Sequence, residues 1–304
     1  MFVIEDNIIY NRSAFDKFGG FIMEMQKENI QHFNFIGMKN PFLLKNMGEA
    51  LKRIIKAVNE REKIVIYGTC DLDGITSVSL LLLVLKYLNA DVEYFISDEV
   101  DDSSIKSDII ENHIKFLGTK LMITAGCGIS SVPQVKLCKN LGIDVIITDY
   151  HSSEEILPET IIIDPNQKQC TYPYKNLTAV GVTFKLCQAI SMYYEMKCVG
   201  KYLDLVALGI LSKQADVSGE NEIMVNQGIY CINYTNNYGV KALLKINNIS
   251  SVNWKSICEL SNKMMRSIKN KRYIDNARIT VELFITENMD RAEQIAKYLK
   301  NEIV

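Results

Sequence analysis

Two carboxylates one residue apart, Asp71 and Asp73, are the residues of this chain whose spacing suggests chemistry. They follow an apolar run at 63–68 and precede another at 77–88, so we expect them where a strand ends and a helix begins. In an open parallel sheet, ligands bind at the carboxyl ends of the strands, and hard divalent cations take carboxylate oxygens. The pair therefore suggests a metal site. A plain helix N-cap would also place acids here, and this motif alone leaves both interpretations open.

Further polar segments follow other apolar runs that are expected to be strands. Such strand ends form the ligand-binding edge of an open parallel sheet. The segments are Ala125-Gly126-Cys127-Gly128 after the run at 120–124, Asp149-Tyr150-His151 after the run at 143–148, and Asp164-Pro165-Asn166 after the run at 160–163.

The order of these segments resembles the DHH phosphoesterase family, and within it the RecJ-like exonucleases that act on single-stranded DNA. The resemblance runs from about Pro41 to the C-terminus and includes Ala-Leu-Gly at 207–209 and Gly-Glu-Asn at 219–221. It implies an α/β fold of the DHH type: a mostly parallel sheet with helices on both faces, followed by a helical C-terminal region. It also implies two Mn²⁺ or Mg²⁺ ions that bind phosphate and activate a water. Such a centre needs about six acid or imidazole ligands around ions roughly 3.5–4 Å apart.

Four ligand positions that the resemblance defines carry other residues here. Thr69 replaces the first Asp of motif one, and Gly126 replaces the Asp of motif two that bridges both metals. Tyr150 replaces a metal-binding His of motif three, and Lys213 stands where motif four has an Asp. Restoring all four ligands together is expected to restore metal binding if the scaffold is intact. Four residues match the family's site residues and form a remnant of that site: Asp71, Asp73, Asp149 and His151.

Lys213 is assigned to motif four by its distance from both the Ala-Leu-Gly and the Gly-Glu-Asn segments. An ammonium at this position would repel a dication. We hypothesise that Lys213 instead neutralises Asp71 and Asp73, which would otherwise repel each other. The alternative is a lysine that points into solvent. Asp216, three residues further on, is the fallback ligand.

The composition narrows the class of protein. The 304 residues are 48% hydrophobic, which is enough for a large core, and the net charge is −2. Unspecific nucleic-acid binding rests on basic residues that neutralise phosphate, and the chain as a whole does not offer this.

Eight cysteines without a Cys-x-x-Cys pair exclude zinc-ribbon and thioredoxin-type sites and are typical of a reducing cytosol. No apolar run reaches the roughly 18 residues of a membrane span, and no signal peptide is recognised. We expect a cytoplasmic protein without membrane contact.

A basic stretch near the C-terminus is the candidate for nucleic-acid binding. Its residues are interleaved with aromatic and apolar side chains, but a run of charges is also typical of a solvated helix face. The candidate residues are Lys263, Arg266, Lys269 and Arg272.

The alternation of strand and helix patterns predicts three parts. Residues 1–60 are a lead-in with a helix at 41–62, residues 61–246 are the DHH-like α/β core, and residues 247–304 are a helical extension. The extension ends in a linker-type helix at 290–303 that lacks a recognisable cap. In RecJ-like proteins a second domain, DHHA1, follows such a helix, and nothing here corresponds to it. The core is expected to hold strands at 63–68, 91–96, 120–125, 143–148 and 160–163, and helices at 76–88, about 104–117 and 130–141.

The resulting functional hypothesis is a RecJ-like DHH domain that has lost metal-dependent hydrolysis. It would need no cofactor and would act as a nucleic-acid-associated or replication and repair scaffold, with single-stranded nucleic acid or a replication or repair protein as partner. The alternative is an active Mn²⁺- or Mg²⁺-dependent phosphodiesterase or single-stranded-DNA exonuclease that holds one metal at Asp71, Asp73 and Asp149. A third hypothesis is a small-nucleotide binder at His151.

Overall fold

The computed structural model describes residues 37–97, 104–152, 156–196, 199–213, 217–269 and 273–302, together with the backbone of two short N-terminal strands. These strands, β1 (Phe2–Glu5) and β2 (Ile8–Asn11), pair as an antiparallel hairpin. In the described chain, no helix is long and apolar enough to cross a membrane.

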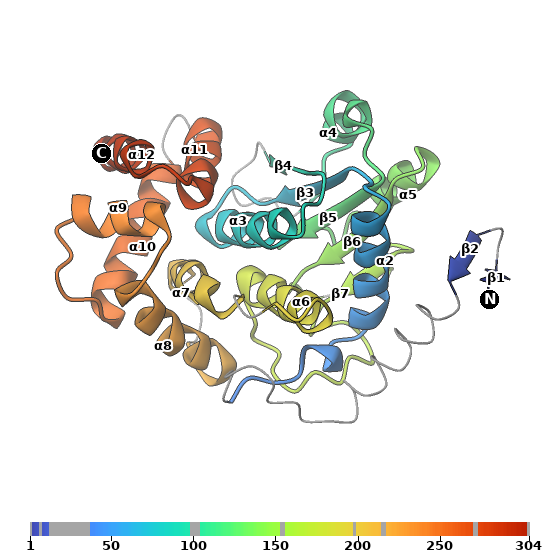
Figure 1. The fold of residues 1–304 in the computed structure, drawn as a ribbon, viewed down its shortest axis with the longest axis horizontal. Helices are drawn as coiled ribbons and strands as arrows, with labels where there is room; N and C mark the ends of the chain where they lie inside the picture. Colours follow the sequence, from blue (N-terminus) through green and yellow to red (C-terminus); the bar gives the residue numbers. More distant parts are fainter. Residues whose placement is uncertain are drawn as a thin grey trace.

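A five-stranded parallel sheet forms the centre of the fold, with the strand order β4-β3-β5-β6-β7 (Figure 1). Each strand matches a predicted one to within a residue at its start, because short apolar runs bounded by turns are typical of buried strands. The strands are β3 (Ile64–Gly68), β4 (Val92–Ile96), β5 (Leu121–Ala125), β6 (Asp144–Thr148) and β7 (Ile161–Ile163).

Helices cover both faces of this sheet, as the resemblance implied (Figure 1). Because successive side chains of a strand point to opposite faces, Ile64 and Ile66 join one apolar core, while Val65 and Tyr67 join the other. The first core is built on α2 (Met47–Asn59), α3 (Leu72–Tyr87), α6 (Ala179–Tyr193) and α7 (Leu203–Ser212). The second lies under α4 (Ser107–Ile109), the π-helix η2 (Ile110–Ile114) and α5 (Val132–Asn140). The 3₁₀ turn η3 (Lys115–Leu117) follows η2 and is exposed.

The C-terminal region is helical and gathers at one end of the molecule (Figure 1). Its buried side chains, among them Leu260 of α10 and Val281 of α11, belong to the same apolar core as α3. The division between core and extension at residue 246 remains a proposal. The helices are α8 (Gly219–Asn233), α9 (Tyr238–Ile246), α10 (Trp254–Ile268), α11 (Tyr273–Ile285) and α12 (Met289–Asn301), and 3₁₀ turns lie at η1 (Pro41–Leu43) and η4 (Val199–Tyr202).

Several predicted helices differ from those observed. The helix expected at 76–88 begins at Leu72, because the Asp71 side chain accepts a hydrogen bond from the Gly74 N–H and caps the first turn. The helix expected at 104–117 is a succession of α, π and 3₁₀ turns. The helix expected at 41–62 is the turn η1 followed by the shorter α2. The last helix does have a cap, since the Asn288 side chain accepts from the Arg291 N–H.

Candidate functional site

The sheet register brings the predicted motifs to one edge. Gly68, Ala125, Thr148 and Ile163 pair in a single row across β3, β5, β6 and β7. The residues that directly follow this row in the chain are Thr69, Gly126, Asp149 and Asp164. The sheet therefore places motifs that are distant in sequence side by side at the carboxyl ends of the strands, where the first motif predicted a ligand site.

Asp71 is a buried carboxylate whose two oxygens both have protein partners. Its Oδ1 accepts from the Gly74 N–H at 2.7 Å and from the Thr69 hydroxyl at 3.1 Å. Its Oδ2 accepts from Lys213 Nζ at 2.6 Å. The Lys213 side chain is 31% exposed and that of Asp71 is 10% exposed. The lysine, which ends α7, thus reaches into motif one instead of pointing into water.

Asp73 is fully buried and is held by the first turn of α6. Its Oδ2 accepts from the Ala179 N–H at 3.0 Å and its Oδ1 from the Val180 N–H at 2.8 Å. A helix N-terminus carries unpaired N–H groups and partial positive charge, and both stabilise an anion. Burial nevertheless raises the pKa of Asp73 to about 6, with Lys213 lowering it and Asp71 raising it.

Lys213 lies within the electrostatic reach of both motif-one acids. Burial by itself lowers the pKa of the Lys213 ammonium, but the charges of Asp71 and Asp73 outweigh burial and raise it. Lys213 therefore stays charged at any physiological pH. The arrangement is the one that the neutralisation hypothesis requires: a direct ion pair with Asp71 and a charge interaction with Asp73.

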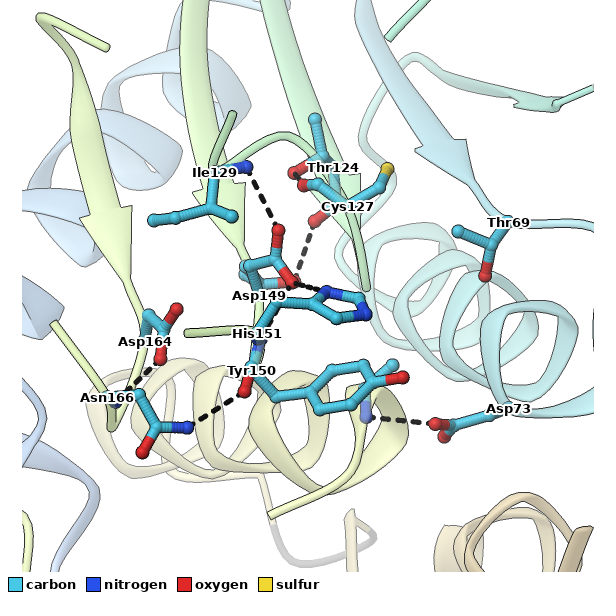
Figure 2. A network of polar contacts seen from close by, with 12 residues as sticks. Thr69, Asp73, Thr124, Cys127, Ile129, Asp149, Tyr150, His151, Asp164 and Asn166 are labelled. Atoms are coloured by element: carbon cyan, nitrogen blue, oxygen red, sulfur yellow. Dashed lines mark hydrogen bonds and ion pairs between the residues drawn. The ribbon is translucent and has the colours of Figure 1, made fainter. Parts of the chain in front are cut away.

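Asp149 and His151 form a second polar cluster at the end of β6 (Figure 2). The Asp149 carboxylate is fully buried and accepts from the N–H groups of Ile129 and Tyr150 at 2.9 and 2.8 Å. His151 Nδ1 lies 2.6 Å from Asp149 Oδ1. This hydrogen bond raises the pKa of the half-exposed imidazole, and burial opposes the rise.

Tyr150 fills the space between the two clusters, and its hydroxyl points toward Asp73 (Figure 2). Its ring lies 4.2 Å from that of His151, and Lys213 Nζ lies 5.7 Å from the ring centroid. Burial, helped by the negative charge of Asp73, raises the pKa of the phenol. At neutral pH the phenol is therefore uncharged, so Tyr150 contributes an apolar ring and a neutral hydroxyl where the resemblance implied a metal-binding imidazole.

Gly126 is buried and adopts a left-handed backbone conformation with φ of +80°. Its N–H donates to the Thr148 carbonyl at 2.8 Å, which fixes the turn after β5. A Cβ atom at this position would lie 2.6 Å from the Ala179 Cβ and 3.8 Å from Thr69 Oγ1. A side chain here would thus point toward motif one, as a bridging ligand must, but no space is left for it.

Asp164 follows β7. The sequence placed it in a polar segment at a strand end but did not predict it as a site residue. It is fully buried, and its Oδ1 accepts from the Asn166 N–H at 2.6 Å. Its Oδ2 has no hydrogen-bond partner among the described residues. Burial raises the pKa of Asp164 to about 7, with the Asn166 hydrogen bond lowering it and Asp149 raising it. Asn166 in turn donates to the Tyr150 carbonyl at 2.8 Å and joins the two strand ends (Figure 2).

The Gly-Glu-Asn segment has a structural contact that its motif does not reveal. Glu220 forms an ion pair with Lys185, and both side chains are almost entirely buried. The Tyr172 hydroxyl donates to the second oxygen of Glu220 at 2.5 Å, and Lys185 also donates to the Lys39 carbonyl. This cluster ties α6, α8 and the segment before η1 together.

The candidate basic residues lie on α10 and just after it. Lys263, Arg266 and Lys269 follow at intervals of three, so they share one side of the helix. Arg266 and Lys269 are exposed and Lys263 is half-buried. Met265, which directly precedes Arg266 in the same helix, accepts a hydrogen bond from the Leu72 N–H. This contact places α10 against the start of α3. Arg272 and Asp216 lie outside the described residues.

Comparison with known proteins decides the family. The model of the DHH family, N-terminal domain, matches residues 63–210. The single-stranded-DNA-specific exonuclease RecJ of Bacillus subtilis is 35% identical over 260 residues, which are 84% of this chain. The chain belongs to the DHH family and is RecJ-like. RecJ of Haemophilus influenzae is 30% identical over 272 residues and 85% of this chain. The chain spans 32% and 47% of the lengths of these two relatives.

A solved structure confirms the fold of this DHH-family chain. The crystal structure of exonuclease RecJ bound to manganese superimposes with a TM-score of 0.77 at 22% identity. The match covers 86% of this chain and 66% of the other. At this identity the likeness concerns the fold. Because that structure holds manganese, the question for this site is whether its residues could hold a metal.

The residues of this DHH domain do not fit a two-metal centre. Every carboxylate oxygen of Asp71, Asp73 and Asp149 already accepts at least one hydrogen bond from the protein. Position 126 has no side chain, and Lys213 brings a positive charge to motif one. In the described part of the chain, no group of three or more His, Cys, Asp or Glu side chains could hold a metal ion.

Sequence reasoning missed the contribution of the α6 N-terminus to this site. No site residue was predicted in the segment beginning Thr178-Ala179-Val180, yet its N–H groups bind Asp73 and its Ala179 side chain blocks position 126. The one signal in the sequence is Thr178 itself, a good N-cap residue, whose hydroxyl accepts from the Gly181 N–H at 3.3 Å. That signal predicts a helix start and does not reveal which side chains it faces.

Proposed function

We propose that this chain is a RecJ-like DHH domain without metal-dependent hydrolysis, working as a nucleic-acid-associated or replication and repair scaffold. The observation that carries the proposal is the ion pair between Lys213 and Asp71, at 2.6 Å. A two-metal mechanism relies on acids that are free to bind cations. Here a lysine ammonium and two helix N–H groups supply the positive charge that motif one needs. The domain fold can therefore persist without metal.

Titration with Mn²⁺ is expected to show at most one weak site per chain. Metal binding would have to displace Lys213 from Asp71 and the α6 amides from Asp73. In addition, position 126 offers no bridging carboxylate. Isothermal titration calorimetry of the full chain measures this directly, and single-stranded DNA and a dinucleotide serve as substrates for a parallel hydrolysis assay with Mn²⁺.

The variant Asp71→Asn/Asp73→Asn is the matched control for this titration. If a weak site is present and persists in the variant, it lies elsewhere on the surface. Two ions bound at micromolar affinity, or Mn²⁺-dependent hydrolysis that the double variant abolishes, would contradict the proposal. Hydrolysis that depends on these acids would support the phosphodiesterase that holds one metal at Asp71, Asp73 and Asp149, whereas two tightly bound ions would indicate a full two-metal centre.

Association with single-stranded nucleic acid is supported by the names of the relatives and by the basic row on α10. RecJ of Bacillus subtilis is named a single-stranded-DNA-specific exonuclease. Lys263, Arg266 and Lys269 share one side of a helix that packs against the start of α3. We therefore propose that the phosphate backbone of a single strand lies along this row.

Replacing Lys263, Arg266 and Lys269 together with alanine is expected to weaken binding of an oligothymidylate several-fold. Each lost phosphate contact should also reduce the slope of log K against log salt by about 0.7. Fluorescence anisotropy at several salt concentrations measures both. Lys136→Ala, an exposed change on α5 at the opposite face of the sheet, is the control. Equal affinity and slope in the triple variant and the parent would exclude this row, leaving a protein partner as the proposal.

We also propose a cytoplasmic location. Cys138, Cys170, Cys187, Cys231 and Cys258 are free thiols. Buried free thiols such as Cys138 and Cys187, whose pKa is raised by burial, behave as small apolar core residues. Such usage suits a reducing compartment.

A further inference from the structure

We infer that Ala179 is a metal-excluding residue: its methyl group occupies the space that a bridging ligand at position 126 would need. The inference rests on the proposed function, because it explains how the loss of metal binding is built into the fold. The sequence points to four replaced ligand positions, and the structure adds a fifth residue that no ligand motif contains.

The contact between the two positions is too close for any side chain at 126. A Cβ on Gly126 would stand 2.6 Å from the Ala179 Cβ, whereas non-bonded carbon atoms prefer about 3.5–4.0 Å. The next nearest atom, Thr69 Oγ1, lies at 3.8 Å. A carboxylate at 126 would thus face Thr69 and motif one, and Ala179 is what stands in its way.

Neither partner in this contact can move aside by rotating a bond. A Cβ position is set by the backbone, so the clash can be relieved only by shifting the chain. The Gly126 N–H is bonded to the Thr148 carbonyl at 2.8 Å. The Ala179 N–H is bonded to Asp73 at 3.0 Å, and Ala179 is 2% exposed. Shifting Ala179 away would therefore pull the α6 amides off Asp73.

Ala179 acts on motif one in two ways. Its N–H donates a hydrogen bond to Asp73, and its methyl group fills the space beside Gly126. Restoring a carboxylate at 126 without opening this space would strain the turn or displace α6. The fourfold ligand restoration, Thr69→Asp/Gly126→Asp/Tyr150→His/Lys213→Asp, is therefore not sufficient, and Ala179→Gly must accompany it.

A double-mutant cycle tests the steric coupling without metal. The variants are Gly126→Asp, Ala179→Gly and the two together, and thermal unfolding is the measurement. Gly126→Asp alone is expected to lower the melting temperature by several degrees more than the same change made in the Ala179→Gly background. The cost of φ +80° for a non-glycine residue is present in both backgrounds and cancels. An equal fall in both backgrounds would overturn the inference.

Mn²⁺ calorimetry on the fourfold variant and on the fivefold variant with Ala179→Gly tests the metal-excluding role. We expect two ions to bind the fivefold variant at least tenfold more tightly than the fourfold one. Equal binding by both, or binding by neither while both unfold cooperatively, would overturn this role. If the fourfold or fivefold variant does not fold, the double-mutant cycle of Gly126→Asp and Ala179→Gly decides whether Ala179 blocks position 126. Tight Mn²⁺ binding by the parent chain would refute the proposed function, while the cycle would still report on Ala179 by itself.

Discussion

Replacing Lys213 with alanine is expected to lower the free energy of unfolding by about 1–3 kcal/mol. Losing one partner of an exposed ion pair costs roughly 0–1 kcal/mol, and losing one partner of a buried pair costs about 3–5 kcal/mol. The side chains here, 31% exposed for Lys213 and 10% for Asp71, lie between these limits. The change would leave Asp71 and Asp73 close together without the cation that offsets their charges. Urea unfolding followed by circular dichroism measures the loss.

The double variant Asp71→Asn/Lys213→Ala is expected to recover part of that loss. Asparagine removes one of the two charges and can still accept the Gly74 N–H as an N-cap. Lys245→Ala is the matched control, because its partner Glu293 lies on the surface and the lysine side chain is 63% exposed. The control should change the unfolding free energy by no more than roughly 1 kcal/mol. A Lys213→Ala protein as stable as the parent would reject the neutralising role and favour the one-metal enzyme.

Replacing Asp164 with asparagine is expected to stabilise the protein in a pH-dependent way. Burial raises the pKa of Asp164 from 3.8 to about 7. Between these values the folded protein keeps a proton that the unfolded chain has lost, so the carboxyl contributes less to stability as the pH rises. The stabilisation by asparagine should therefore be absent below about pH 4, grow up to about pH 7, and stay constant above it. One pKa unit corresponds to about 1.4 kcal/mol, so the upper bound is about 4 kcal/mol.

The asparagine side chain can take over the local contact of Asp164, since its carbonyl oxygen can accept from the Asn166 N–H as Oδ1 does. Thermal unfolding at pH 4.5, 6 and 8, compared with the parent, gives the pH dependence. Glu159→Gln is the control, because that side chain is 90% exposed. Its replacement should change the melting temperature only slightly and by the same amount at every pH. A difference between Asp164→Asn and the parent that does not grow from pH 4.5 to 8 would show that this carboxyl is ionised in the folded protein.

The sequence by itself determined the sheet and the family. Short apolar runs such as 64–68 and 121–125, bounded by turn residues, are typical of strands that are buried on both faces of a parallel sheet. The family followed from several motifs in one order, and the substituted positions Thr69, Gly126, Tyr150 and Lys213 could be read directly. These are local features or counts of residues, and they do not depend on how helices dock.

Only the tertiary structure decided what the substituted residues do. Lys213 meets Asp71 across 142 residues of sequence, and the Ala179 N–H meets Asp73 across 106. Both contacts depend on how α6 and α7 pack against α3. The steric relation between Gly126 and Ala179 depends in addition on the exact placement of a helix start against a strand end. Sequence patterns report periodicity along one element, whereas a blocked ligand position arises where three elements meet within a few ångströms.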